Sequence, residues 1–163
     1  MWAAALACLG LATVGSGPAL ADVVGAAKVI DGDTIDVGSE RVRLHGIDAP
    51  ESQQNCWIAG IAWPCGRDAR VVLANAIGGQ SVHCVGNKHD RYGRWIAVCY
   101  AGDQNLNAEL VRGGWAMAYR RYAKDYIGEE AEARAAARGM WRGQFVEPWE
   151  WRQGTREPNS EQR

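Results

Sequence analysis

Polar and apolar residues alternate with a period of two near the start of the chain. Between Arg41 and Leu44, the apolar side chains of Val42 and Leu44 fall on one face and the two arginines on the other, because successive side chains of a strand point to opposite faces. Arg43 is therefore expected to point away from the core. Similar short segments, interrupted by Asp-Gly and Gly-Ser turns, run through residues 23–37 and predict two further strands.

The hydrophobic period changes to that of a helix after a loop at residues 49–66. Apolar residues recur at helical spacing from Ala69 to Ile77, and two glycines end the run. The rest of the pattern predicts two strands and two helices, at residues 80–85, 94–100, 108–112 and 128–138. Asn105 or Asn107 is expected to cap the first of these two helices.

The order of these elements predicts an α+β fold. Three strands, a helix, two strands and two helices suggest a small five-stranded β-barrel, closed or partly open, with three helices packed beside it. An open α+β sheet would produce the same order of elements. A length of 163 residues and 47% hydrophobic composition suit one domain with its own core.

Both ends of the chain differ from this pattern. Residues 1–21 are uncharged and apolar up to Val14 and end in Ala-Leu-Ala, which predicts an export signal cut before Asp22. An uncleaved anchor and a lipid-modified Cys8 are the alternatives. Residues 152–163 are polar and predict a disordered tail. The folded domain is therefore expected at residues 22–151, in a periplasmic or secreted protein with no membrane association after signal cleavage.

Four cysteines are left once the export signal is removed, and an even number in an exported chain indicates disulfides. Of the three possible pairings, we favour Cys56 with Cys65, closing a loop, and Cys84 with Cys99, across a hairpin. A zinc site is the alternative, although the chain has no Cys-x-x-Cys pair.

Two acidic segments suggest a site for a hard divalent cation. Asp31 and Asp33 lie two residues apart in a turn, and Asp48 and Glu51 follow the strand that carries Arg43. Carboxylate oxygens are the ligands that calcium prefers, and a glutamate one water away would activate a nucleophile. An EF-hand is excluded, because Val42 stands where that motif requires Glu at its twelfth position. Ordinary hairpin turns and an acidic surface loop are the alternatives.

The segment Asp90-Arg91-Tyr92-Gly93-Arg94 brings two arginines and an aromatic ring to the turn of a hairpin. Charge for phosphate and a ring for a base suit nucleotide binding, although an isolated solvated turn would look the same. The net charge of −1 and pI of about 6.3 provide no overall attraction for nucleic acid, so any binding must use a local basic groove. Together, the acids and arginines suit metal-assisted cleavage of a phosphodiester.

With these motifs, the chain resembles the thermonuclease family typified by staphylococcal nuclease, and in particular its exported bacterial relatives with cysteines. The resemblance runs from about Val24 to Trp151 and includes Gly139-Met140-Trp141 and Pro148-Trp149-Glu150-Trp151. It implies an OB-like five-stranded barrel with three helices, one bound Ca²⁺, cleavage of DNA and RNA, and products that end in a 3′-phosphate. It also implies in-line attack by water at phosphorus.

The resemblance assigns a role to each site residue. The implied metal ligands are Asp33, Asp48, the backbone carbonyl of Ala49 and, through water, Asp31. The implied catalytic residues are the phosphate-clamping arginines Arg43 and Arg94 and the general base Glu51. The implied nucleotide contacts are Arg91, Tyr92 and Tyr119.

Ala49 departs from the family pattern, which has Thr at this position. A backbone carbonyl survives this change, so we expect an active enzyme with reduced metal affinity. Two other readings stay open: a catalytically weak or inactive OB-fold module that binds nucleic acid, and a disulfide-stabilised exported domain with no ligand. The protein is expected to act as a monomer.

Overall fold

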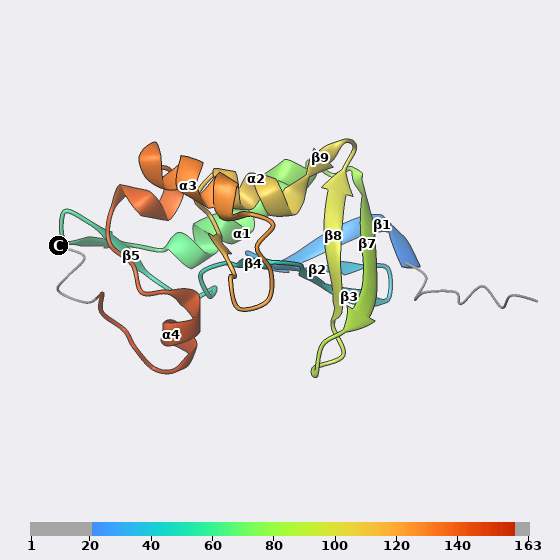
Figure 1. Cartoon of the computed structure of the whole chain (residues 1–163), viewed down its shortest axis with the longest axis horizontal. Helices are drawn as coiled ribbons and strands as arrows, with labels where there is room; N and C mark the ends of the chain where they lie inside the picture. Colours follow the sequence, from blue (N-terminus) through green and yellow to red (C-terminus); the bar gives the residue numbers. More distant parts are fainter. Residues whose placement is uncertain (1–20, 159–163) are drawn as a thin grey trace, which may run out of the picture.

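The computed structural model describes residues 21–158 of the chain. Its centre is a sheet with the strand order β3-β2-β1-β7-β8-β9, in which β3 also pairs with β8. The strands are β1 (Ala21–Asp31), β2 (Thr34–Val37), β3 (Glu40–Leu44), β7 (Ser81–His89), β8 (Trp95–Ala101) and β9 (Gln104–Asn105). The five longer strands thus close into a barrel, and β9 pairs antiparallel with the end of β8 (Figure 1).

The pairing of β3 with β8 closes the barrel. These strands run parallel, with Val42 opposite Trp95 and Leu44 opposite Ala97, whereas the other four barrel pairings are antiparallel. All four of these side chains are buried in the largest hydrophobic cluster. The closed barrel confirms the predicted α+β, OB-like fold and excludes the open sheet.

Two short strand pairs lie outside the barrel. β4 (Ile47–Asp48) pairs with β10 (Met117–Ala118), and β5 (Cys56–Ile58) forms a hairpin with β6 (Ile61–Trp63). β4 follows β3 after a turn at Gly46, whose φ of +72° suits a glycine. The turn and the β10 pairing place Asp48 just beyond the end of the barrel strand that carries Arg43.

Four α-helices and one 3-10 helix accompany the barrel in the part of the chain that the structure describes. They are α1 (Cys65–Ile77), α2 (Leu106–Arg112), α3 (Ile127–Ala135), η1 (Gly139–Arg142) and α4 (Pro148–Arg152). The first three match the predicted helices, although α1 begins four residues before Ala69. The prediction missed α4, because five residues are too short to show a helical period. In Figure 1, α4 lies apart from the group formed by α1, α2 and α3.

Both predicted disulfides are present. Cys84 and Cys99 face each other on β7 and β8 and are bonded, and Cys56 is bonded to Cys65 at the start of α1. All four residues are buried. Because the sulfur of each of these four cysteines is bonded to another sulfur, none of the four is a free thiolate for the alternative zinc site.

The predicted terminal segments fall largely outside the described residues. The export signal lies there except for Ala21, the first residue of β1, and so do residues 159–163 of the predicted tail. Arg152, where that tail was expected to begin, is the last residue of α4, and residues 153–158 form turns and irregular backbone. No helix among residues 21–158 is both long and apolar enough to cross a membrane.

Asn107 joins α2 to the barrel and does not cap the helix. The cap is Asn105, whose side chain accepts a hydrogen bond from the N–H of Ala108 at 3.0 Å. Asn107 is fully buried; its Oδ1 accepts from the N–H of Cys99 at 3.1 Å, and its Nδ2 donates to the carbonyl of His45 at 2.9 Å. It thereby ties the helix to β8 and to the turn after β3.

We predict that Asn107→Ala lowers the free energy of unfolding by about 1–3 kcal/mol, because it leaves the buried N–H of Cys99 and the partly buried carbonyl of His45 without their partner. Urea unfolding with the disulfides intact measures this loss. Asn75→Ala is the control, since Asn75 is exposed on α1. Equal unfolding midpoints for the two variants would contradict the structural role of Asn107.

Candidate active site

One cleft of about 770 Å³ collects the residues that the sequence motifs singled out. All the predicted catalytic and nucleotide-contacting residues line it, and so do Asp31 and Asp33. The other two predicted metal ligands, Asp48 and Ala49, are buried. Segments that are distant in the sequence therefore meet at one place on the barrel.

The turn between β1 and β2 carries the first two acids. The N–H of Asp33 donates to Oδ1 of Asp31 at 3.0 Å, and Oδ2 of Asp33 accepts from the N–H of Ala49 at 2.8 Å. Between the acids, Gly32 approaches the chain so closely that a Cβ there would lie 2.7 Å from the Cβ of Ala49. This close packing brings the segment of Asp48 and Ala49 against the first acidic turn.

Arg43 forms ion pairs with two of the predicted metal ligands. Its Nη1 forms an ion pair with the carboxylate of Asp33, and its Nη2 donates to Oδ1 of Asp48 at 2.8 Å. The Arg43 side chain is only 13% exposed, and that of Asp48 is fully buried. The alternation within β3 correctly predicted that Arg43 points away from the barrel core, and the structure turns it toward the acids.

A second guanidinium reaches the same acids from the end of α4. Nη2 of Arg152 lies 2.7 Å from Oδ2 of Asp48, and its Nη1 lies 2.7 Å from Oε1 of Glu51. The sequence prediction missed this residue, because no spacing or motif connects residue 152 with residues 48 and 51. The one signal was the aromatic segment immediately before it, Pro148-Trp149-Glu150-Trp151, which the sequence analysis placed in the folded domain.

Burial and mutual repulsion shift the protonation of this acidic cluster. Burial, together with the nearby charge of Asp33, raises the pKa of Asp31 to about 6. Burial also raises the pKa of Asp48, against the opposing effect of Arg152 and Arg43. Carboxylates whose pKa values are raised in this way are stabilised as anions by any added cation.

The oxygen donors of this cluster fit a hard divalent cation, which prefers carboxylate and carbonyl ligands. Within residues 21–158, however, no three His, Cys, Asp or Glu side chains are arranged so that they could hold a metal ion. The carboxylates of Asp33, Asp48 and Glu51 are paired with arginines instead. The assignment of individual metal ligands, including the carbonyl of Ala49, stays a prediction.

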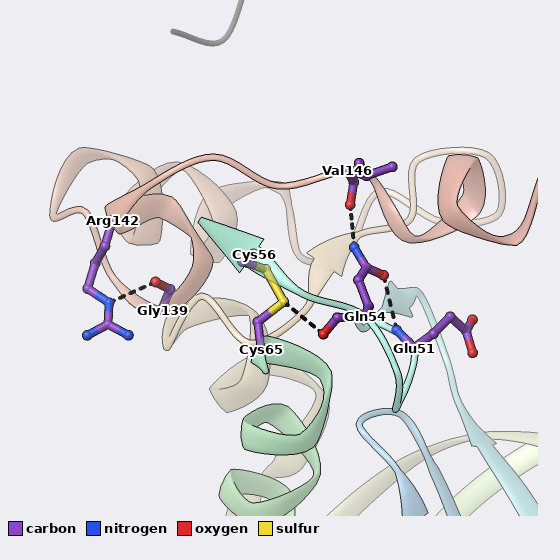
Figure 2. Close-up of a disulfide and its surroundings, with 7 residues drawn as sticks. All are labelled: Glu51, Gln54, Cys56, Cys65, Gly139, Arg142 and Val146. Carbon is purple, nitrogen blue, oxygen red and sulfur yellow. Dashed lines mark hydrogen bonds between the residues drawn. A yellow bond between two sulfur atoms is a disulfide. The ribbon is translucent and has the colours of Figure 1, made fainter. Parts of the chain in front are cut away.

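Gln54 holds the loop of Glu51 and joins it to the C-terminal segment (Figure 2). The residue is fully buried; its Nε2 donates to the carbonyl of Val146 at 2.6 Å, and its Oε1 accepts from the N–H of Glu51 at 3.2 Å. Sγ of Cys65, in the disulfide beside the loop, lies 3.6 Å from the carbonyl oxygen of Gln54. Gln54 therefore positions Glu51, a role that its sequence neighbours did not indicate.

The first turn of α1 packs directly against the same loop. A Cβ at Gly66 would lie 1.7 Å from the carbonyl oxygen of Glu51, so only glycine allows this approach. We predict that Gly66→Ala destabilises the protein by about 1–3 kcal/mol, the range typical of overpacking, and lowers activity because the Glu51 loop must move. Thermal unfolding and kcat measure the two effects.

Gly128→Ala is the matched control for this prediction. Gly128 lies in the first turn of α3, where a Cβ would meet no atom within 4 Å, so alanine should be neutral or slightly stabilising. An unchanged kcat for Gly66→Ala, together with an unchanged unfolding temperature, would contradict the proposed packing.

The turn between β7 and β8 forms the basic side of the cleft. Arg94 is paired with Asp90, with Nη2 2.7 Å from Oδ2, so its guanidinium is turned toward its own hairpin. The guanidinium carbons of Arg91 and Arg94 lie 4.7 and 5.5 Å from the centre of the Tyr92 ring. The ring is 67% exposed, so the predicted nucleotide contacts are accessible from the cleft.

Tyr119, the third predicted nucleotide contact, is partly covered by α4. Its ring stacks on that of Trp149 at an interplanar angle of 5° and a centroid distance of 5.7 Å. Tyr122 contacts the same tyrosine ring edge-on at 4.9 Å. Trp149 therefore packs against a residue that lines the cleft.

Comparison with known proteins agrees with this geometry. Residues 41–143 match the family described as staphylococcal nuclease homologue. The chain is 39% identical over 158 residues to a micrococcal nuclease of Shigella flexneri, covering 85% of this chain and 86% of that protein. It is 37% identical over 133 residues to an uncharacterized endonuclease of Escherichia coli O157:H7, covering 77% and 81%.

A longer plant protein shares the same region. The chain is 34% identical over 119 residues to the probable staphylococcal-like nuclease CAN2 of Oryza sativa subsp. japonica, but spans only 30% of its length. The family match covers more than half of this chain, and the Shigella flexneri relative aligns with most of both proteins. This chain therefore belongs to the staphylococcal nuclease family.

Proposed function

We propose that this protein is an exported, calcium-dependent nuclease that hydrolyses DNA and RNA and leaves 3′-phosphate ends. One observation carries the proposal: four carboxylates and the arginines Arg43 and Arg94 come from distant segments and meet around one cleft. Acids that attract a divalent cation, next to guanidiniums that bind phosphate, suit phosphodiester hydrolysis. The names of the related proteins support the same activity.

Each residue of the cleft has a separate role in the proposed reaction. Glu51 accepts a proton from the attacking water, and Gln54 holds its backbone in place. Arg43 and Arg94 bind the phosphate and stabilise the charge that builds on its oxygens. Asp33, Asp48 and the carbonyl of Ala49 would hold Ca²⁺ directly, and Asp31 would hold it through a water. The ion would polarise the phosphate and lower the pKa of the attacking water. Water attacks in line, and the 5′-oxygen leaves.

The basic hairpin binds the rest of the nucleic acid. Arg91 contacts a neighbouring phosphate, and the rings of Tyr92 and Tyr119 stack on bases. Because these contacts read charge and ring faces and not base edges, both DNA and RNA are expected as substrates. The two disulfides suit a periplasmic or extracellular location, where we expect a monomer.

Digestion of single- and double-stranded DNA and RNA with calcium, magnesium or EGTA tests the proposal. We expect cleavage with calcium, loss of cleavage with EGTA, and recovery when excess calcium is added back. The products should accept a 5′-phosphate from polynucleotide kinase without prior phosphatase treatment, since their 5′ ends carry hydroxyl groups. Full activity in EGTA would overturn calcium dependence.

A second candidate function is a binding module without catalysis. Its specific support is the pairing of Asp48 and Glu51 with Arg152, which engages a proposed metal ligand and the proposed base. Binding of an oligonucleotide with no cleavage under any of these metal conditions would favour this function.

A further inference from the structure

The C-terminal segment is built into the candidate active site at three points. The carbonyl of Val146 accepts a hydrogen bond from Gln54, the ring of Trp149 stacks on Tyr119, and Arg152 pairs with Asp48 and Glu51. The first two contacts fix the backbone of α4 beside the cleft. The third places a cationic side chain among the acids.

Arg43 and Arg152 are held in the cluster very differently. The Arg43 side chain is 13% exposed and contacts the carboxylates of both Asp33 and Asp48 as well as the carbonyl of Asp33. The Arg152 side chain is 39% exposed and lines the cleft, and its contacts in the structure are the two carboxylates. Arg152 is therefore the arginine that can leave without disturbing the barrel.

The charges of the cluster match a divalent cation. Four carboxylates, those of Asp31, Asp33, Asp48 and Glu51, face two guanidiniums, so the formal charge is −2. Without Arg152 itself, the four carboxylates and Arg43 carry a formal charge of −3. A divalent cation held by the aspartates would lower this charge to −1 and so weaken the attraction that holds Arg152. Its guanidinium would then be free to pair with an anionic phosphate, which it can bind through two parallel N–H donors.

We propose that Arg152 is a further phosphate-binding arginine, held on Asp48 and Glu51 until a divalent cation binds Asp48 and then turned to the substrate. The proposal rests on the proposed metal-dependent nuclease function. Because Trp149 anchors α4 on Tyr119, a rotation of the Arg152 side chain is sufficient and the helix stays in place. Such a residue makes substrate binding conditional on metal binding.

Arg152→Gln tests this proposal with two measurements: calcium binding should become tighter, and substrate binding should become weaker. Calcium affinity, measured by isothermal titration calorimetry without substrate, should rise several-fold, because a competing cation has been removed. KM for a short single-stranded oligodeoxynucleotide at saturating calcium should rise about tenfold, the loss expected for one charge-assisted contact. A residue that only braced the two carboxylates would instead weaken calcium binding when removed.

Two variants complete the design. Arg156→Gln is the matched control, because within residues 21–158 the Arg156 side chain contacts the ring of Trp151 and backbone carbonyls and lies outside the cleft. Both quantities should stay at wild-type values. Arg152→Lys keeps the charge without the planar fork, so calcium affinity should return toward wild type while KM stays raised. Thermal unfolding of each variant shows that it is folded.

Unchanged or weaker calcium binding by Arg152→Gln would overturn the proposal, and so would an unchanged KM. In either case an active, calcium-binding wild-type protein would leave the proposed nuclease function intact. A wild-type protein that neither binds calcium nor cleaves the oligonucleotide would overturn both.

Discussion

Arg43→Ala is expected to lower kcat/KM on DNA by about a hundredfold or more, the typical loss for a preorganised donor that stabilises transition-state charge. Arg43 is largely buried, and its position is determined by Asp33 and Asp48 before substrate arrives. Its donors therefore need little reorganisation when charge develops on the phosphate. Steady-state cleavage of a fluorogenic oligonucleotide at saturating calcium measures the loss.

Arg41→Ala is the matched control for this variant. Arg41 lies two residues earlier on β3, but its side chain is 54% exposed and pairs with Asp36, so its removal should change kcat/KM less than twofold. Arg43→Lys should recover little, because an ammonium cannot replace the two-pronged contact. Similar kcat/KM values for Arg43→Ala and Arg41→Ala would contradict the role of Arg43.

Asp33→Asn should weaken calcium binding at least about tenfold and lower kcat by about a hundredfold. The substitution keeps the size of the side chain but removes the charge that faces Arg43 and that would face the proposed cation. Calorimetry reports calcium affinity, and cleavage at saturating calcium reports kcat. Measuring both separates weaker metal binding from a slower chemical step.

Asp36→Asn provides the comparison for Asp33→Asn. Asp36 lies on the neighbouring strand β2 and pairs with the exposed Arg41, outside the cleft. The Asp36→Asn variant should bind calcium and cleave DNA like the wild-type protein. If Asp33→Asn also retained wild-type calcium affinity, Asp33 would not be a metal ligand.

Local sequence patterns were sufficient for the five barrel strands and for the separate halves of the candidate site, but they missed the short strands, including the β5–β6 hairpin inside the expected loop. The alternation of Val42 and Leu44 with Arg43 predicted both the buried and the exposed face of β3, since a period of two depends only on backbone geometry. Turn residues and spacing also indicated the disulfide pairs. The acids and arginines were recognised because their chemistry is visible one segment at a time.

These local patterns did not predict contacts between distant segments. The pairing of β3 with β8 turns the small strands into a closed barrel, and that closure brings Arg43 and Arg94 to one cleft. Gln54 looked like an ordinary loop residue, although its side chain links Glu51 to Val146. Arg152 was predicted to begin a disordered tail, although its side chain contacts Asp48 and Glu51, which lie about a hundred residues earlier in the chain.

The sequence by itself determined the strand faces, the chemical character of the site and the family resemblance, because each depends on residue type and short-range spacing. Only the tertiary structure decided barrel closure, the burial of Asp48 and the placement of Arg152 on the acids. These features depend on which distant segments pack together, and packing is governed by shape and burial that no local period encodes.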